Sequence, residues 1–228
     1  MEHKIKQDWK DIFPNTKFSK KYHITAEVLN SVTHGLGVVL AIVGTILLLI
    51  KAYHNQSIIE FIAYSIYGLG LFVLYLCSTL YHSLTFTRAR KVFRVFDHSS
   101  IFIVIAASYT PYMLVGLANP LGYTILSIIW IIAFLGVITQ ATKINKPNRR
   151  GAVWLYLLMG WMIIFAIKPI TQILDTRGLW LLIAGGLSYS IGIIFYALSK
   201  KVKFSHTIWH LFVLAGSITM YLSIYLSL

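Results

Sequence analysis

Seven long apolar stretches constrain the fold of this chain more than any other feature. Each is about 20 residues long, the length that an α-helix needs to cross a hydrocarbon core of about 30 Å. Continuous apolar runs predict helices, because the strands of a membrane barrel alternate polar and apolar residues over about ten positions. The sequence therefore predicts an all-α bundle of seven transmembrane helices. The stretches are Leu29–Ile50, Ile58–Leu84, Ser99–Val115, Leu121–Ala141, Val153–Ile170, Leu179–Leu198 and Thr207–Ser227.

The composition agrees with an integral membrane protein. Of the 228 residues, 57% are hydrophobic and only 12% are charged, and the mean hydropathy is +0.74. No polar linker of domain-boundary length interrupts the apolar stretches, so we expect a polar N-terminal tail over residues 1–24 and one membrane domain over residues 25–228. The tail lacks the apolar core of a cleavable signal peptide. Cys77 is the only cysteine, which excludes an intramolecular disulfide and a cysteine-rich metal site.

The distribution of lysine and arginine predicts the orientation of the bundle. Seventeen of these residues lie in the N-terminal tail and in the second, fourth and sixth loops. The opposite loops carry only Lys51, Lys168 and Arg177. By the positive-inside rule, the N-terminus is cytoplasmic and the C-terminus is outside.

The same distribution explains the formal net charge of +13 without nucleic acid. The basic residues lie between apolar stretches and belong to no nucleic-acid-binding motif, so we expect them to orient the helices and meet anionic headgroups. The expected partners are membrane lipids and a lipid substrate, with no nucleic acid. A homodimer is an open alternative.

Four ionisable residues fall at one predicted membrane level. His206 and His210 share a helix face at i and i+4 spacing, which lets one helix grip a metal ion. His82 and Asp97 lie at the edges of two other apolar stretches, at the same cytoplasmic level. Alone, the histidine pair is as compatible with interfacial or hydrogen-bonded residues as with ligands. Because ionisable side chains are costly in a bilayer, the four together favour a metal site.

Three imidazoles with an open fourth position are typical of a catalytic zinc site. Zinc lowers the pKa of a bound water towards about 7 and supplies hydroxide at neutral pH. Asp97 is the candidate general base, and Ser78, one turn before His82, is a candidate to position the water or a carbonyl.

Further polar residues at this level are assigned supporting roles. Glu27, Asn30 and His34 form one stripe on the first apolar stretch and are expected to tie it to its neighbours. His98 follows Asp97 but points elsewhere on the third stretch, and we assign it to the surroundings of the site or to a headgroup contact.

These motifs resemble the hemolysin III branch of the progestin and adiponectin receptor superfamily. They are Glu27-x-x-Asn30-x-x-x-His34, Ser78-x-x-x-His82, Asp97-His98-Ser99 and His206-x-x-x-His210, and the match covers the chain after Tyr22. The resemblance implies a seven-helix fold with a cytoplasm-facing zinc at His82, His206 and His210. It also implies that Asp97 contacts the zinc-bound water and that Ser78 belongs to the same site.

The resemblance also suggests an activity and a location. Eukaryotic relatives look like ceramidases, which hydrolyse a lipid amide. The short tail and compact loops look bacterial, which implies the bacterial plasma membrane. There the family is named for haemolytic activity and has been linked to membrane fluidity homeostasis.

The residues and the resemblance together leave three candidate functions for the protein. The first is a zinc-dependent hydrolase of a lipid amide or ester, linked to membrane lipid homeostasis. The second is a non-enzymatic sensor or regulator in which a structural zinc staples helices. The third is a haemolysin acting as a pore, which the nearly uncharged outer halves of the apolar stretches disfavour.

Overall fold

The computed structural model describes residues 17–142 and 149–228, and all regular structure in these two ranges is helical. Seven helices are long and apolar enough to cross a membrane, as the sequence predicts. The predicted tail, residues 1–24, falls largely outside the described residues, and the first helix of the described part begins at Lys20. The helices are α2 (Lys20–His54), α3 (Ile58–Ser83), α4 (Arg90–Pro111) with the π-helical turn η1 (Tyr112–Leu117), α5 (Pro120–Thr142), α6 (Arg149–Trp161) with the 3₁₀ turn η2 (Met162–Ala166) and α7 (Ile167–Ile173), α8 (Thr176–Leu198) and α9 (Ser205–Ser227).

Local sequence explains several helix ends. The side chains of Ser19, Ser57 and Asp175 accept hydrogen bonds from the first turns of α2, α3 and α8, which satisfies backbone N–H groups that have no partner inside the helix. Pro120 opens α5, where its missing N–H costs nothing. Ser57, Asp175 and Pro120 lie within four residues of the predicted spans, whereas Ser19 lies ten residues before Leu29, so α2 begins well before its predicted span.

The fifth span departs from the continuous helix that its apolar run predicts. Pro169 cannot donate a backbone hydrogen bond and crowds the carbonyl of Phe165, which favours a distorted turn just before it. That turn is η2. The hydroxyl of Tyr109, on α4, donates to the carbonyls of Met159 and Gly160 at 2.8 Å and accepts from the N–H of Ile163 at 2.9 Å. The broken helix is tolerated because this side chain satisfies its backbone groups.

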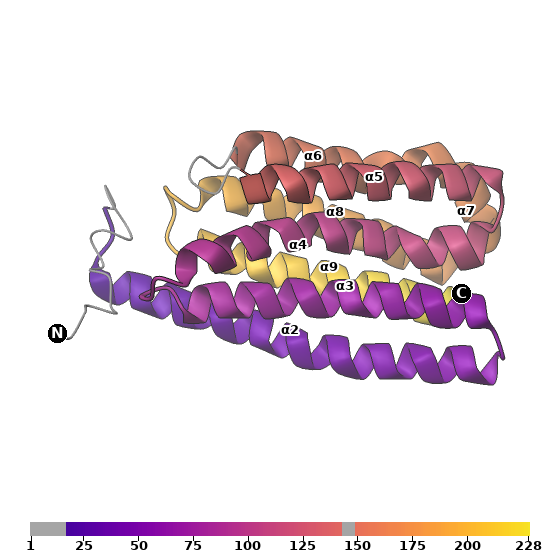
Figure 1. Ribbon diagram of the computed structural model, residues 1–228, viewed down its shortest axis with the longest axis horizontal. Coiled ribbons are helices and arrows are strands. Elements are labelled where there is room, and N and C mark those ends of the chain that lie inside the picture. Colours follow the sequence, from indigo (N-terminus) through magenta and orange to yellow (C-terminus); the bar gives the residue numbers. More distant parts are fainter. Residues whose placement is uncertain (1–16, 143–148) are drawn as a thin grey trace.

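The helices run roughly along one axis, and the start of α2 and the end of α9 lie at opposite ends of the bundle, as an odd number of spans requires (Figure 1). Consecutive helices α2, α3, α4 and α5 pack as neighbours, as do α8 and α9, and α9 also packs against α2. We call the end that carries residues 17–23, the turn at 84–89 and the segment 199–204 the basic end. It lies at the left of Figure 1, and we expect it to face the cytoplasm.

Candidate metal centre

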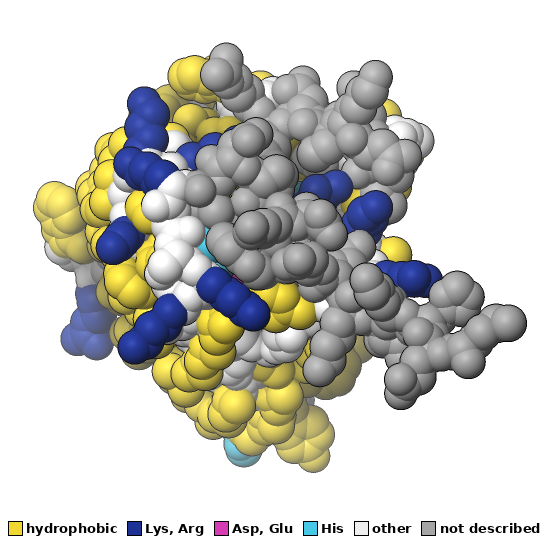
Figure 2. All heavy atoms as spheres, turned by 90° about the vertical axis from the view of Figure 1, so that its left-hand side faces the viewer, with side chains coloured by type: hydrophobic (Ala, Val, Ile, Leu, Met, Phe, Trp, Pro, Cys, Tyr) yellow, Lys and Arg dark blue, Asp and Glu magenta, His cyan; other side chains and the backbone are white. Residues whose placement is uncertain are grey.

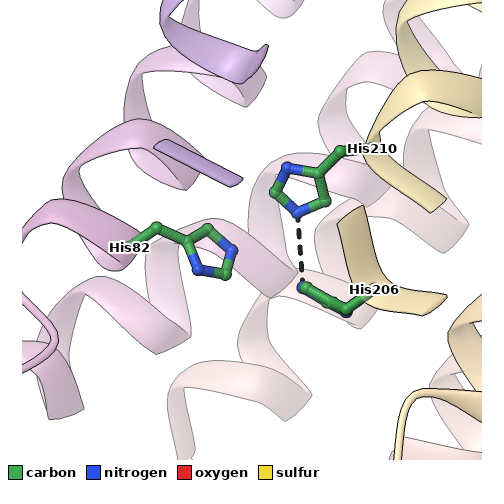
Figure 3. Close-up of side chains that lie close together, drawn as sticks. All are labelled: His82, His206 and His210. Atoms are coloured by element: carbon green, nitrogen blue, oxygen red, sulfur yellow. Dashed lines mark hydrogen bonds between the residues drawn. The ribbon is translucent and has the colours of Figure 1, made fainter. Parts of the chain in front are cut away.

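Three histidines from two helices meet near the basic end. The ligand nitrogens of His82, on α3, and of His206 and His210, on α9, all lie within 4.8 Å of one another, so the three residues can hold a metal ion. The Nε2 atoms of His206 and His210 are 3.3 Å apart. In Figure 3 the imidazole of His82 faces this pair from the opposite helix. The fold thus brings together the three histidines that the sequence predicts as ligands.

The two helices place these side chains by simple geometry. His206 and His210 occupy the first two turns of α9, one above the other. That helix starts sharply after Phe204, whose φ is +56°, and the Ser205 hydroxyl anchors it by donating to the carbonyl of Phe195 at 2.7 Å. His82 lies in the last turn of α3 and is 4% exposed, so its imidazole is held inside the bundle.

Glu27 of α2 fixes the orientation of His82. Its Oε2 lies 2.6 Å from Nδ1 of His82 and also accepts a hydrogen bond from the hydroxyl of Thr85 at 2.9 Å. A carboxylate partner assigns the imidazole proton to Nδ1, which leaves the lone pair on Nε2. That Nε2 atom is buried and has no hydrogen-bond partner among the described residues. It is therefore available to a metal ion.

Asn30 supports His210 in a similar way. The backbone carbonyl of Asn30 lies 3.2 Å from Nδ1 of His210, and its side-chain oxygen accepts from the hydroxyl of Thr207 at 2.6 Å. Nδ1 is thus occupied by an acceptor, and Nε2 faces His206. The start of α2 therefore links both helices that carry the histidines.

His34 lies beside the cluster but outside the group that can hold a metal. Its ring stacks on that of His210, with centroids 3.7 Å apart and planes 19° apart, and it meets the ring of Tyr75 edge-on. It is 3% exposed. His34 therefore covers one face of the His210 ring and restricts its rotation.

The structure places Asp97, Ser78 and His98 around the cavity next to the histidines. Ser78 is buried and Asp97 is half-buried. His98 is outside the group that can hold a metal, and its Nδ1 bonds to the carbonyl of Arg94 at 2.7 Å. Neither carboxylate, Asp97 or Glu27, belongs to the metal-holding group found in the described chain.

A cavity of about 900 Å³ opens beside the three histidines. It extends away from the basic end between α4, the broken fifth span, α8 and α9, and its deep wall includes Tyr112 and Met220. Met220 is ten residues beyond His210 on α9, about 15 Å along the helix axis. The metal centre therefore lies at one end of a long and mostly apolar chamber.

The residues that support the ligands were not predicted from the sequence. Thr85 and Thr207 hold Glu27 and Asn30, yet neither stands out in the sequence, since hydroxyl residues are frequent in these stretches. Their only signal is position, three residues after His82 and one after His206. Arg90 and Arg94 also line the cavity, and nothing in their sequence signals this, because loop arginines are expected for membrane orientation alone.

Comparison with known proteins gives one consistent result. A family model described as haemolysin-III related matches residues 22–221. The chain is 42% identical over 198 residues to Hemolysin-3 of Bacillus cereus, covering 87% of this chain and 90% of the relative. It is 39% identical over 200 residues to the Hemolysin-3 homolog of Bacillus subtilis (strain 168), covering 88% and 93%. It is 32% identical over 203 residues to the Monocyte to macrophage differentiation factor of Homo sapiens, covering 86% and 82%.

Proposed function

The chain belongs to the haemolysin-III related family, and from this premise we propose that it is a zinc-dependent membrane hydrolase that cleaves an amide or ester bond of a lipid. The family match and the seven long apolar helices identify it as a multi-pass protein of the cell membrane. The observation that carries the proposal is the group of three histidines at the end of the apolar chamber. The link to membrane lipid homeostasis is part of the same proposal.

The donor set fits zinc. Zinc binds imidazole nitrogen at about 2.0–2.1 Å, so two nitrogens on one tetrahedral ion lie about 3.3–3.4 Å apart. The Nε2 atoms of His206 and His210 have this spacing, and the buried Nε2 of His82 lacks any other described partner. Three histidines leave a fourth position for water, the pattern of a catalytic site. When bound, zinc supplies a water of lowered pKa and polarises a carbonyl.

The remaining residues have separate tasks in this hydrolysis. Asp97 accepts the proton of the attacking water and then delivers it to the leaving amine or alcohol. Ser78 donates a hydrogen bond that orients the water or the scissile carbonyl. Glu27 holds His82 in the tautomer that presents Nε2, and the Asn30 carbonyl does the same for His210.

The chamber supports a lipid as the substrate. Several of its lining residues are also exposed on the apolar outside of the bundle, among them Trp161, Ile164 and Ile167 of the fifth span. Across from them on α8 lies Ser190, whose hydroxyl accepts from the indole N–H of Trp161 at 3.2 Å. A lipid that enters from the bilayer between these helices can place its acyl chain in the chamber and its carbonyl at the histidines.

The test is fatty-acid release by purified full-length protein loaded with one equivalent of zinc. The substrates are ceramides, N-acyl lipids and phospholipids, and release is followed by mass spectrometry. Asp97→Asn should keep zinc and fold but lower turnover about 10²- to 10⁴-fold. Asp175→Asn, at the opposite end of the bundle, is the matched control and should retain activity. No release from any lipid, or equal release by Asp97→Asn, contradicts the proposal.

A structural zinc in a non-enzymatic sensor is the second candidate. It is favoured by the hydrogen bonds that tie α2 to both histidine-bearing helices, since an ion that joins α3 and α9 would also hold these contacts of α2 in place. Chelation separates the two functions. If the chelated protein unfolds and no turnover is measured with zinc, the zinc is structural. If the chelated protein loses turnover but keeps its helical circular dichroism spectrum, the protein is a hydrolase.

A further inference from the structure

Two glycines that line the chamber have open space where a side chain would begin. A Cβ atom at Gly160 of α6 or at Gly186 of α8 would meet no heavy atom of the described residues within 4 Å beyond its own helix turn. At Gly185 and Gly192 of α8, by contrast, a Cβ atom would come within 3 Å of side chains of α9. Close helix packing therefore requires glycine at these two positions but not at Gly160 and Gly186, where the missing side chain leaves a gap.

Both Gly160 and Gly186 belong to helix faces that line the chamber. On α8, the lining residues of this face are spaced three and four positions apart and are Ile183, Gly186, Ser190 and Ile193. On the fifth span, the lining residues that are also exposed are Gly160, Trp161, Ile164 and Ile167. The chamber thus reaches the outside of the bundle between these two faces, and we call this opening the window.

One side-chain hydrogen bond crosses the window. The indole N–H of Trp161 donates to the hydroxyl of Ser190 at 3.2 Å, and Ser190 donates to the carbonyl of Gly186 at 2.8 Å. Ser190 is four residues nearer the basic end than Gly186, so the Trp161–Ser190 bond bounds the window on the side of the histidines. The open part of the window therefore lies further from the histidines, beside the glycines.

The window lies deeper in the membrane than the metal centre. Gly192 of α8 packs against Trp209 and Phe212 of α9. These two residues lie on either side of His210 in the sequence, so Gly192 marks the level of the histidines. Gly186 is six residues from Gly192, about 9 Å further from the basic end. An acyl chain that starts at the histidines and runs along the chamber therefore passes the window.

The chamber is shorter than a long acyl chain. Met220 lies about 15 Å beyond His210 along α9, and beyond Met220 the bundle is closed by buried side chains that include Met113, Ile170 and Ile224. Carbon–carbon bonds of about 1.52 Å at angles of about 111° advance an extended chain by about 1.25 Å per carbon. About twelve carbons therefore fill this distance, and the remaining carbons of a longer chain need another path.

The flank of the bundle suits an acyl tail better than the basic end does. Figure 2 looks onto the basic end and shows lysine and arginine side chains there, with hydrophobic side chains at the flanks. Next to the window, Phe165 and Leu187 are exposed on the flank. Because apolar surroundings stabilise an acyl tail, the window leads to a suitable environment.

We propose that the tail of a long acyl chain leaves the chamber through the window, past Gly160 and Gly186, while its carbonyl lies at the three histidines. The substrate is then a lipid whose acyl chain is longer than about twelve carbons. This rests on the proposed hydrolase function and names its substrate by chain length. Gly160 and Gly186 determine the preference, because a side chain at either position narrows the window.

The test compares two probes that differ only in chain length, N-octanoylethanolamine and N-octadecanoylethanolamine. Calorimetry measures their dissociation constants on purified, zinc-loaded, full-length protein that carries Asp97→Asn, so that binding is read without turnover. Each probe is compared with itself across variants, so that its partition into detergent cancels. The octanoyl chain spans about 9 Å and ends at the edge of the window, whereas the octadecanoyl chain is longer than the chamber.

Gly160→Leu and Gly186→Leu are the decisive variants, because leucine enters the open space and narrows the window. Each should raise the dissociation constant of the octadecanoyl probe about tenfold, the effect of about two methylene groups that lose their burial. The constant of the octanoyl probe should change by less than about twofold, because its chain does not pass the window. Ala184→Leu is the matched control, since Ala184 is exposed on α8 but does not line the chamber, and it should change neither constant.

The outcomes separate this proposal from the hydrolase function. Unchanged binding of the octadecanoyl probe in either folded leucine variant overturns the window, as does an equal loss for both probes or an equal loss in Ala184→Leu. If the leucine variants do not fold, Gly160→Ala and Gly186→Ala give the same comparison, with an expected loss of about threefold for the long probe alone. Lipid hydrolysis without a chain-length-dependent effect overturns the window while the hydrolase stands. A selective loss without hydrolysis of any lipid supports the window and counts against the hydrolase.

Discussion

Removing the Glu27 carboxylate should weaken metal binding although Glu27 is not a ligand. The carboxylate accepts the Nδ1–H of His82 at 2.6 Å and the Thr85 hydroxyl at 2.9 Å, so Glu27→Ala leaves a buried imidazole N–H without its acceptor. Carboxylates behind a metal-bound histidine are worth about 10- to 100-fold in metal affinity. We therefore expect the zinc dissociation constant to rise by this factor, which is about 1.4–2.7 kcal/mol. Glu27→Gln should lose less than about tenfold, because its amide oxygen still accepts the proton without the charge.

The assay is competition for zinc between the purified full-length protein and a fluorescent chelator. Glu60→Gln is the matched control, since Glu60 is a glutamate at the opposite end of α3 that accepts a hydrogen bond from Asn55. Thermal unfolding of each variant shows whether the fold is kept. An unchanged zinc dissociation constant in folded Glu27→Ala protein would refute the inference that α2 orients the metal site.

Two further predictions concern the fold. Tyr109→Phe should destabilise the bundle by about 1–3 kcal/mol, because two carbonyls and one N–H of the broken fifth span lose their partner. Tyr53→Phe, on the exposed end of α2, should not destabilise it. The shift of the thermal unfolding midpoint in detergent measures both effects. The pKa of the Asp175 carboxyl lies below its ordinary value of 3.8, because it accepts hydrogen bonds from the Ser227 hydroxyl and the Gly178 N–H. The contribution of this carboxylate to stability is therefore complete above pH 3.8 and is lost as the pH falls through the lowered pKa. Asp175→Asn should remove this acid-dependent loss from thermal melts recorded between about pH 5 and pH 2. Equal pH profiles for the variant and the unchanged protein would contradict this prediction.

The seven spans were predictable because each apolar run alone is long enough to cross the membrane. The histidine cluster was predictable because i, i+4 spacing is local to α9 and the charge count places His82 at the same level. Whether Asp97 and Ser78 act in catalysis remains a prediction, as does the cytoplasmic side of the basic end.

What the sequence could not predict depends on contacts between distant segments. The break in the fifth span follows from Pro169, but its backbone partner is Tyr109, 50 residues before Met159. The same limit applies to Arg90 and Arg88, which are two residues apart and equal in charge. Only the packing of α4 against its neighbours determines that one lines the cavity and the other does not.

The most direct test of the central claim, an open zinc site on three histidines, is the zinc absorption-edge spectrum of the purified full-length protein. The account predicts about one zinc per chain, bound by three imidazole nitrogens and one exchangeable oxygen at about 2.0–2.1 Å. His210→Ala should lose that signature. A chain without zinc, or a zinc with four protein ligands and no exchangeable oxygen, would contradict the account.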